Sequence, residues 1–186
     1  IALAETRIAY GSKEANLQSE PLRIRAMETS TDITISAQAA SLPSGFLQPR
    51  RLYISSTPNI EVDYLTPASF WDNWISSDSG IPTKYTVEGE QFLFGPSPDT
   101  GYTGKSLYYK KFDALSADGD TNWLLTNAPG AYLFGTLTEA FSFTRNLDQA
   151  QYAYNKFVGI INGLNGSDKA DRYPGPWTAT SDTGNP

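Results

Sequence analysis

The sequence predicts an α+β protein, in which a helical bundle carries an inserted antiparallel β-domain and ends in an extended C-terminal arm. Three observations lead to this prediction. Apolar residues follow a helical period at the start of the chain and again beyond residue 126, they follow a period of two in between, and the end is rich in proline and glycine. The predicted domains are 1–17 with 127–165 for the bundle, 18–126 for the β-rich insertion and 166–186 for the arm.

The composition excludes several classes of site. The 186 residues are 39% hydrophobic and 13% aromatic, which is enough for a sizeable core. There is no Cys and no His, so disulfides, thiolate nucleophiles and Cys/His zinc sites are excluded. A formal net charge of −6 argues against binding DNA by neutralising its phosphates. We find no apolar run that approaches the roughly 18 residues of a membrane span and expect no membrane contact.

Residues 1–17 are predicted to be the end of a helix. Ile1, Ala4 and Ile8 fall on one face, and Gly11 is expected to end or interrupt the helix. Because this helix starts at the first residue without a cap, we expect further sequence, itself helical, to precede Ile1.

The first part of the insertion is predicted to contain strands. Residues 22–27 alternate apolar with basic side chains, as a half-buried strand does, and residues 31–37 alternate through Ile33 and Ile35. A turn at 42–45 should precede a short strand at 51–54.

The second part of the insertion is predicted to hold a short helix and a meander. Thr66 can cap a helix that begins at Pro67 and places Phe70, Trp71 and Trp74 on one face. Residues 84–87 and 91–94 flank Glu88-Gly89-Glu90, the signal of a tight hairpin, and residues 102–111 form a third strand. Together these strands predict a small antiparallel sheet or barrel.

Two helices are predicted to follow the insertion. Asn127 can cap the first, with Pro129 in its first turn. Its core face is predicted to be formed by Leu133, Leu137, Ala140 and Phe141. The second helix starts at Asn146, with Gln149 in a capping-box arrangement, and Gly163 and Gly166 are expected to end it.

The acidic motifs do not predict catalysis. Residues 118–122 have the spacing that opens an EF-hand, but Trp123 stands where Gly is needed, so a surface turn is the commoner explanation. The carboxylate pairs Glu61/Asp63 and Glu88/Glu90 have the residue types of a glycosidase, but nothing in the sequence shows that any of them is buried. We therefore expect no catalytic residue, cofactor or metal.

Ten stretches in order resemble the head–tail adaptor (connector) proteins of tailed bacteriophages of the short-tailed type. The resemblance spans about residues 1–165. The stretches are AETRI (4–8), LRIRAMET (22–29), LPSGFL (42–47), RRLY (50–53), GIPTKY (80–85), FGPSPD (94–99), YY (108–109), NWLL (122–125), APGAYLFG (128–135) and LTEA (137–140).

This resemblance implies a virion structural protein that is made in the bacterial host cytoplasm. In the family, a homo-oligomeric ring of typically twelve neighbouring adaptor subunits lies beneath the portal protein and joins it to tail nozzle or fibre proteins. DNA passes through the channel without specific binding, and an acidic subunit suits such a channel because it repels phosphates. The family has no catalytic residues to transfer.

Two groups of residues are candidates for partner binding. The apolar anchors of the C-terminal arm are Tyr173, Pro174, Pro176 and Trp177, which would lie along the portal or an adjacent subunit. The basic candidates are Arg23, Arg25, Arg50 and Arg51, although exposed strand residues explain them equally well.

Two other functions remain open from the sequence. A carbohydrate-binding or tail-spike-like β module would use exposed Trp and Tyr side chains. Four aromatic residues could stack on sugar rings, although aromatics at helical spacing are more often core: Tyr64, Phe70, Trp71 and Trp74. The pair of helices predicted over 127–164 argues against it, since a β lectin does not need them. An acid-based glycosidase would need a deep pocket with two converging carboxylates.

Overall fold

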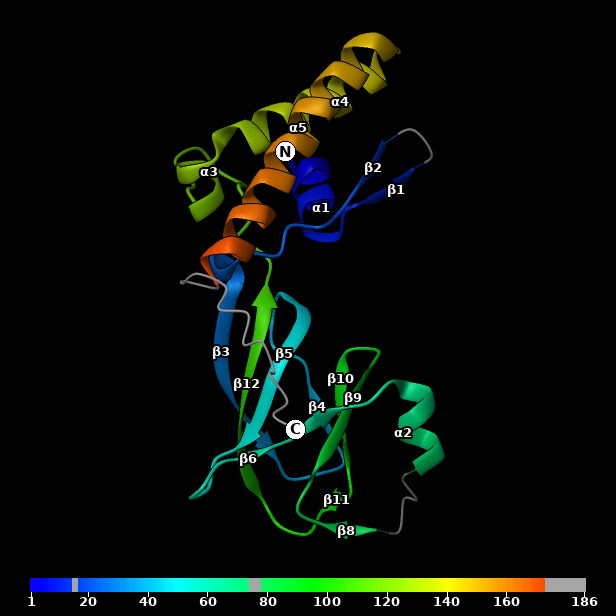
Figure 1. Cartoon of the computed structure of the whole chain (residues 1–186), viewed down its shortest axis with the longest axis vertical. Helices are drawn as coiled ribbons and strands as arrows, with labels where there is room; N and C mark the ends of the chain where they lie inside the picture. The colour runs from blue at the N-terminus through cyan, green and yellow to red at the C-terminus, as the bar shows by residue number, and fades with distance from the viewer. Residues whose placement is uncertain (15–16, 74–77, 173–186) are drawn as a thin grey trace, which may run out of the picture. The chain divides into compact units, whose positions relative to one another are not determined.

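The computed structural model describes residues 1–14, 17–73 and 78–172 of the chain (Figure 1). The chain divides into two compact units, which we call unit 1 (Ile1–Arg25 with Leu124–Pro186) and unit 2 (Ala26–Trp123). Among the described residues, unit 1 is mainly helical and unit 2 is mainly β-structure, so the α+β class predicted from the sequence is confirmed.

Unit 1 packs one short helix against two longer ones. The described helices are α1 (Ala2–Tyr10), α3 (Trp123–Asn127, which begins at the unit boundary), α4 (Pro129–Phe143) and α5 (Leu147–Asp171). Small residues allow close approach, because a Cβ on Gly135 of α4 would lie 3.0 Å from the Cβ of Ala4 and 3.4 Å from the ring of Phe157. The packed helices bury apolar side chains at a helical spacing on α5, including Ala150, Ala153, Phe157 and Ile161.

Helix α1 is shorter than predicted. Gly11 ends it, as expected, with a φ of 72° and its N–H bonded to the carbonyl of Arg7 at 2.8 Å. The chain then forms a hairpin of β1 (Ser12–Glu14) and β2 (Leu17–Ser19), so the helix predicted for residues 12–14 and 17 is wrong. A side chain at position 11 would meet the Ser19 carbonyl at 2.4 Å, which makes glycine necessary where the hairpin folds back.

The segment 22–27 is not a strand. It leads into a short 3₁₀ turn, η1 (Arg25–Met27), and none of the described strands pairs with it. Leu22, Ile24 and Met27 are nevertheless buried, while Arg25 is exposed. The alternation of apolar and basic residues in the sequence therefore reflects which side chains of this segment are buried. Alternation describes which side chains face a core and does not require a neighbouring strand.

Two four-stranded sheets form most of unit 2 (Figure 1). The first sheet has the order β3-β12-β5-β6, with strands β3 (Glu28–Ile35), β12 (Tyr102–Lys110), β5 (Phe46–Ile54) and β6 (Ile60–Glu61). The second has the order β4-β10-β9-β7, with strands β4 (Ala39–Ser41), β10 (Gln91–Gly95), β9 (Lys84–Glu88) and β7 (Asp63–Tyr64). A parallel pair, β8 (Ser79–Gly80) with β11 (Ser97–Pro98), completes the described strands.

Local predictions within unit 2 are confirmed, whereas one pairing is wrong. Strands β9 and β10 form the predicted hairpin around Gly89, which has a φ of 59°. Helix α2 (Pro67–Asn73) begins after Thr66, whose hydroxyl accepts from the N–H of Ser69 at 3.4 Å. The third strand of the predicted meander, β12, lies instead in the other sheet between β3 and β5.

One apolar core serves both sheets of unit 2. It contains residues from β3, β5, β9 and β10 and from the segment at Val62, namely Ile35, Leu52, Ile54, Val62, Tyr85, Phe92 and Phe94. Burial of the phenol raises the pKa of Tyr85 to about 12. Half-buried Ile33, Ala40, Leu42 and Phe46 close the rim of this core.

Candidate assembly surfaces

Helix α4 turns a second apolar face outward. The predicted core face is wrong for Leu133, which is 57% exposed, and for Ala140, which is also exposed, whereas Leu137 and Phe141 are half-buried. The fully buried residues lie on another face and are Ala131, Tyr132, Gly135 and Thr138. A helix that is apolar around most of its circumference is normally buried on more than one side. The face of α4 that carries Leu133 and Ala140, which we call the outer face, is therefore a candidate for contact with another protein chain.

The charge on α4 is already neutralised within unit 1. Glu139, the one charged residue of this helix, accepts from Arg7 of α1, with Oε1 2.7 Å from Nη2 and 2.9 Å from Nε. Arg7 is buried and lies over the ring of Tyr154 at 6.0 Å. Since this charge is paired, it does not oppose the burial of the outer face.

The turn between α4 and α5 presents two further apolar side chains. Phe143 is 90% exposed and Leu147 is 72% exposed, on either side of the turn. Arg145 adopts a φ of 57°, which reverses the chain, and the Asn146 side chain accepts from the N–H of Gln149 at 3.5 Å to start α5. This start of α5 was predicted correctly from the capping pattern.

Helix α4 does not start as predicted. Asn127 ends α3, and Ala128 occupies the cap position of α4 without a side-chain hydrogen bond. Pro129 nevertheless occupies the first turn of α4, as predicted.

Helix α5 does not end at Gly163 or Gly166. It continues to Asp171 because its last two turns bind the segment that leads out of unit 1. The side chain of Asn165 accepts from the N–H of Arg23 at 2.9 Å, and Asp168 accepts from the N–H of Arg25 at 2.6 Å. Residues 166–171, predicted to open the arm, are thus helical.

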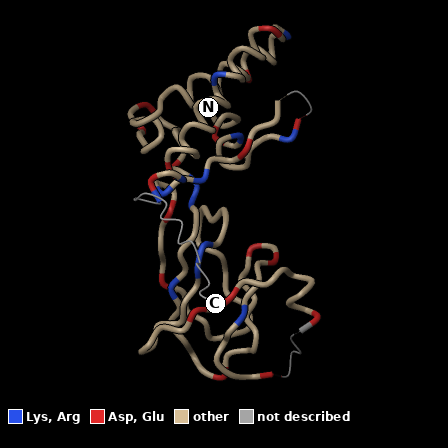
Figure 2. Tube along the Cα trace, viewed as in Figure 1, with Lys and Arg blue, Asp and Glu red and all other residues tan. Residues whose placement is uncertain are grey.

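The net charge lies in unit 2 (Figure 2). Unit 2 contains 12 acidic and 6 basic residues, which gives a formal charge of −6, whereas unit 1 contains eight of each. Copies of unit 1 can therefore approach one another with little net repulsion, whereas copies of unit 2 repel each other and repel nucleic acid.

The four candidate arginines all have partners inside their own unit. In unit 1, the guanidinium of Arg23 donates to the carbonyls of Ala9 at 2.9 Å and Leu22 at 2.7 Å, and that of Arg25 is 4.0 Å from Asp168. Contact of Arg23 and Arg25 with another protein stays a prediction.

In unit 2, Arg50 pairs with Glu28 at 3.4 Å and lies over the ring of Tyr109 at 5.4 Å. Arg51 donates to the hydroxyl of Tyr53 at 2.9 Å. The pairing of β5 with β12 shifts register between Pro49 and Arg51, so Arg50 lies in a bulge where the usual alternation of side chains is interrupted. Contact of Arg50 and Arg51 with another protein also stays a prediction. The arm residues Tyr173, Pro174, Pro176 and Trp177 lie outside the described residues, as does Trp74.

The acidic motifs have structural partners. In the loop 116–120, the carboxylate of Asp120 accepts from the N–H groups of Ser116 and Ala117 at 2.8 and 2.7 Å, and these bonds lower its pKa. Within the described part of the chain, no group of acidic residues is arranged to hold a metal ion. The loop is an acidic turn, which was the commoner of the two explanations for this motif in the sequence.

The carboxylate pairs are tied to neighbouring side chains. Glu61 lies 3.9 Å from Arg51, and Asp63 pairs with Lys84. Glu88 accepts from the indole N–H of Trp71 at 3.1 Å. Glu61, Asp63 and Glu88 are all exposed, whereas a glycosidase needs two carboxylates that converge in a deep pocket.

The aromatic residues proposed for sugar stacking divide into core and surface. Phe70 is fully buried, whereas Tyr64 is 49% and Trp71 52% exposed. Tyr64 packs edge-on against Tyr85, with ring centroids 5.5 Å apart. Tyr64 and Trp71 are therefore accessible to a sugar ring, whereas the buried ring of Phe70 is not.

Comparison with known proteins identifies the family. A family model described as SU10 adaptor protein matches residues 1–180. The chain belongs to the SU10 adaptor protein family. This confirms the resemblance to phage head–tail adaptors, and it indicates a structural adaptor role in a phage.

Two further findings concern this member of the SU10 adaptor family. No curated protein matches the chain. Over the described residues, no helix has the length and apolar character needed to cross a membrane.

Proposed function

We propose that this SU10 adaptor family member forms a head–tail adaptor ring, typically of twelve copies, that binds the portal protein and receives tail nozzle or fibre proteins. DNA would pass through the ring without specific binding. The observation that carries the proposal is the family match over residues 1–180. The proposal keeps the predicted plan of a helical bundle, a β-rich insertion and an arm, but its bounds follow the two units, with the β1–β2 hairpin in unit 1 and α5 reaching Asp171.

The surface properties of unit 1 support the ring. Subunits packed head-to-tail need apolar surface without net repulsion, and unit 1 combines the outer face of α4 with a balanced charge. The acidic character of unit 2 suits a protein past which DNA must slide, because phosphates are repelled. In the arm, Tyr173, Pro174, Pro176 and Trp177 would anchor each copy on the portal or a neighbour.

Light scattering of the full chain, alone and mixed with purified portal rings, tests the proposal. We expect a monomer that becomes a stoichiometric ring only on the portal. A chain that stays monomeric with portals would overturn the proposal, and a glycan array would then test the surface of Tyr64 and Trp71.

Variants locate the contact. Leu133→Glu places a charge on the outer face of α4 and should abolish ring formation on the portal while the chain stays folded. Ile81→Glu, at an exposed apolar side chain of unit 2, is the matched control and should assemble normally. Truncation after Arg172 leaves α5 complete and should weaken assembly; incorporation equal to that of the full chain would disprove the role of the arm.

A further inference from the structure

The two sheets of unit 2 each end in an antiparallel edge strand beside the same hollow. Strand β3 is the first strand of one sheet and β4 the first strand of the other. Among the described residues, β3 pairs only with β12, and β4 only with β10. In an antiparallel edge strand, alternate residues direct their N–H and C=O groups away from the neighbouring strand, so both edges have free backbone groups.

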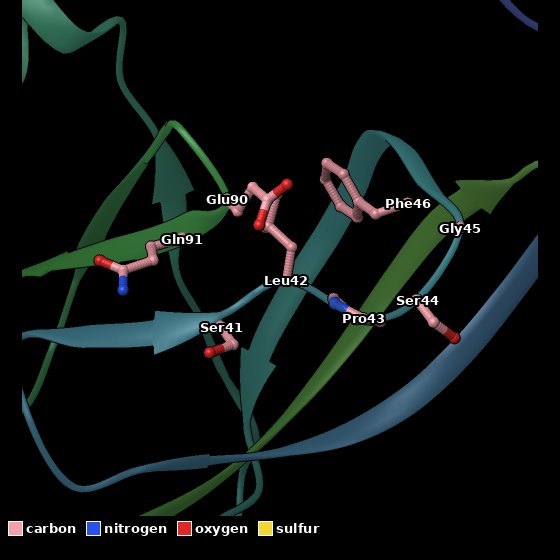
Figure 3. A pocket seen from close by; sticks show the side chains of 8 residues that line it. All are labelled: Ser41, Leu42, Pro43, Ser44, Gly45, Phe46, Glu90 and Gln91. Carbon is pink, nitrogen blue, oxygen red and sulfur yellow. The ribbon is translucent and has the colours of Figure 1, made fainter.

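The hollow beside these edges is a groove in two adjoining parts. The part of about 380 Å³ is lined by residues 41–46 with Glu90 and Gln91, and in Figure 3 the side chains of Leu42, Phe46 and Glu90 lie near one another. The part of about 310 Å³ is lined by residues 31–34 of β3 with Ala40. Ser41 and Pro43 line both parts, so the two parts adjoin at these residues.

The lining of the groove combines an apolar floor with acidic charge. Ile33, Ala40, Leu42 and Phe46 pack against the core of unit 2 and line the groove with their remaining surface. Asp32 and Glu90 are the charged lining residues, and both are exposed. Nearby, the aliphatic stem of Lys110 packs beside Gly45, and its ammonium group pairs with Asp113 at 3.4 Å. This chemistry fits an extended chain with alternate apolar side chains and a basic group.

Apart from the charges of Glu28 and Asp32, strand β3 lacks the features that normally protect an edge. Its eight residues, ETSTDITI, contain no Lys and no Pro, and its pairing with β12 runs without a register shift from Glu28 to Ile35. On the other side of β12, the interior strand β5 contains Pro49 and pairs with two register shifts. Long regular edges without Lys, Pro or bulges are the ones that accept an added strand.

We propose that β3 receives an extended segment of another protein chain as an added strand, with apolar side chains over Ile33 and Leu42 and a basic side chain opposite Asp32. Backbone hydrogen bonds to β3 supply affinity, and the groove supplies specificity. This proposal rests on the proposed function and deepens it, because it assigns the surface on which an adaptor receives an arm of the next virion component.

Amide hydrogen exchange at β3 tests this directly. The isolated chain and purified virions are exposed to deuterated buffer, quenched, dissociated and analysed with single-residue resolution. We expect alternate amides of β3 to exchange at least tenfold more slowly in virions than in the isolated chain, while the remaining β3 amides, bonded to β12, change little.

Each other outcome overturns the inference in a recognisable way. If virions contain the chain but β3 exchanges as in isolation, the added strand is wrong and the adaptor function stands. If virions lack the chain, both fail. If alternate β3 amides are already slow in the isolated chain and become fast after truncation at Arg172, the groove is filled by the chain's own end and not by a partner.

A charge variant gives a second measurement. Asp32→Lys should reduce recovery of the next component with adaptor-bearing particles at least fivefold, because it places a positive charge opposite the basic group. Asp118→Lys changes charge equally in an exposed loop outside the groove and should have no effect. Equal recovery with both variants contradicts the proposed basic contact.

Discussion

The backbone N–H of Arg25 donates a hydrogen bond to Oδ1 of Asp168 over 2.6 Å, which binds the last turn of α5 to the segment that leaves unit 1. One turn earlier, Asn165 accepts from the N–H of Arg23 at 2.9 Å and donates to the carbonyl of Pro21 at 3.2 Å. Two side chains of α5 thus form hydrogen bonds with backbone groups of a segment that lies outside the described sheets. We expect this connection to contribute to the stability of unit 1.

Asp168→Asn should destabilise the protein at neutral pH by about 1–2 kcal/mol, since hydrogen bonds to a charged acceptor are lost. Burial alone would raise the pKa of Asp168, but the N–H of Arg25 and the guanidinium of Arg172, at 2.7 Å, lower it below its ordinary value. The folded state therefore binds this proton more weakly than the unfolded chain. The stabilisation is complete above the unfolded pKa of about 3.9 and is lost as the pH falls through the lower folded pKa.

Denaturant unfolding of wild type and Asp168→Asn between pH 7 and pH 2 measures this dependence. The difference between the two should shrink as the pH falls below about 4. Asp171→Asn, at the exposed last residue of α5, is the control and should match wild type. A difference that stays constant across the range would show that the charge of Asp168 is not responsible.

Glu139→Gln should lower the free energy of unfolding by about 2–3 kcal/mol, because it leaves the buried guanidinium of Arg7 with only the exposed carboxylate of Glu14, at 3.8 Å. Replacing both residues, as Arg7→Met with Glu139→Met, removes the uncompensated charge and should recover part of the loss. Chemical denaturation of the single and double variants forms a mutant cycle. Additive losses would mean that the two side chains do not interact.

Gly104→Ala should destabilise unit 2 by about 1–3 kcal/mol. Gly104 lies in β12 between β3 and β5, and an added Cβ would lie 2.7 Å from Cδ1 of Ile35 and 3.2 Å from the carbonyl of Tyr53. Gly101→Ala is matched in chemistry but meets nothing within 4 Å. Thermal unfolding of the two variants compares them, and equal midpoints would contradict the close packing of the first sheet.

Sequence patterns predicted the local structure best. Four features were predicted in this way: the hairpin at Gly89, the start of α2 after Thr66, the end of α1 at Gly11 and the start of α5 at Asn146. Each depends on the backbone preferences of a few neighbouring residues, which do not require a tertiary contact. The α+β class followed from the change of hydrophobic period. These predictions are confirmed because the signals are local.

Predictions that depended on partners distant in the sequence were less successful. Helix α5 continues beyond Gly163 and Gly166. Its residues Asn165 and Asp168 bind backbone groups more than 140 positions away in the sequence. The preference of glycine for helix ends is a local signal and could not predict these contacts. Strand β12 pairs with β3 and β5 because of the core that they share. Helix α4 has apolar residues on two faces, so its period alone could not identify the buried one.

The candidate surfaces show the same division. The sequence singled out arginines by type, but only the fold shows that Arg23 binds the carbonyls of Ala9 and Leu22. The groove along β3 could not be predicted, since residues 31–34 and Glu90 meet there only through the arrangement of two sheets. The family resemblance, carried by short ordered motifs, was independent of these contacts and is confirmed.

The division of unit 1 between two distant parts of the sequence has a consequence for synthesis on the ribosome. Ala4 and Ile8 of α1 are buried in unit 1, but α4 and α5, which complete that unit, are translated only after the roughly 100 residues of unit 2. At bacterial elongation rates this delay is about 5–20 s, long enough for unit 2 to fold first as it emerges. The nascent chain therefore exposes the apolar face of α1 throughout that interval, and binding by a chaperone at this stage would protect it from aggregation.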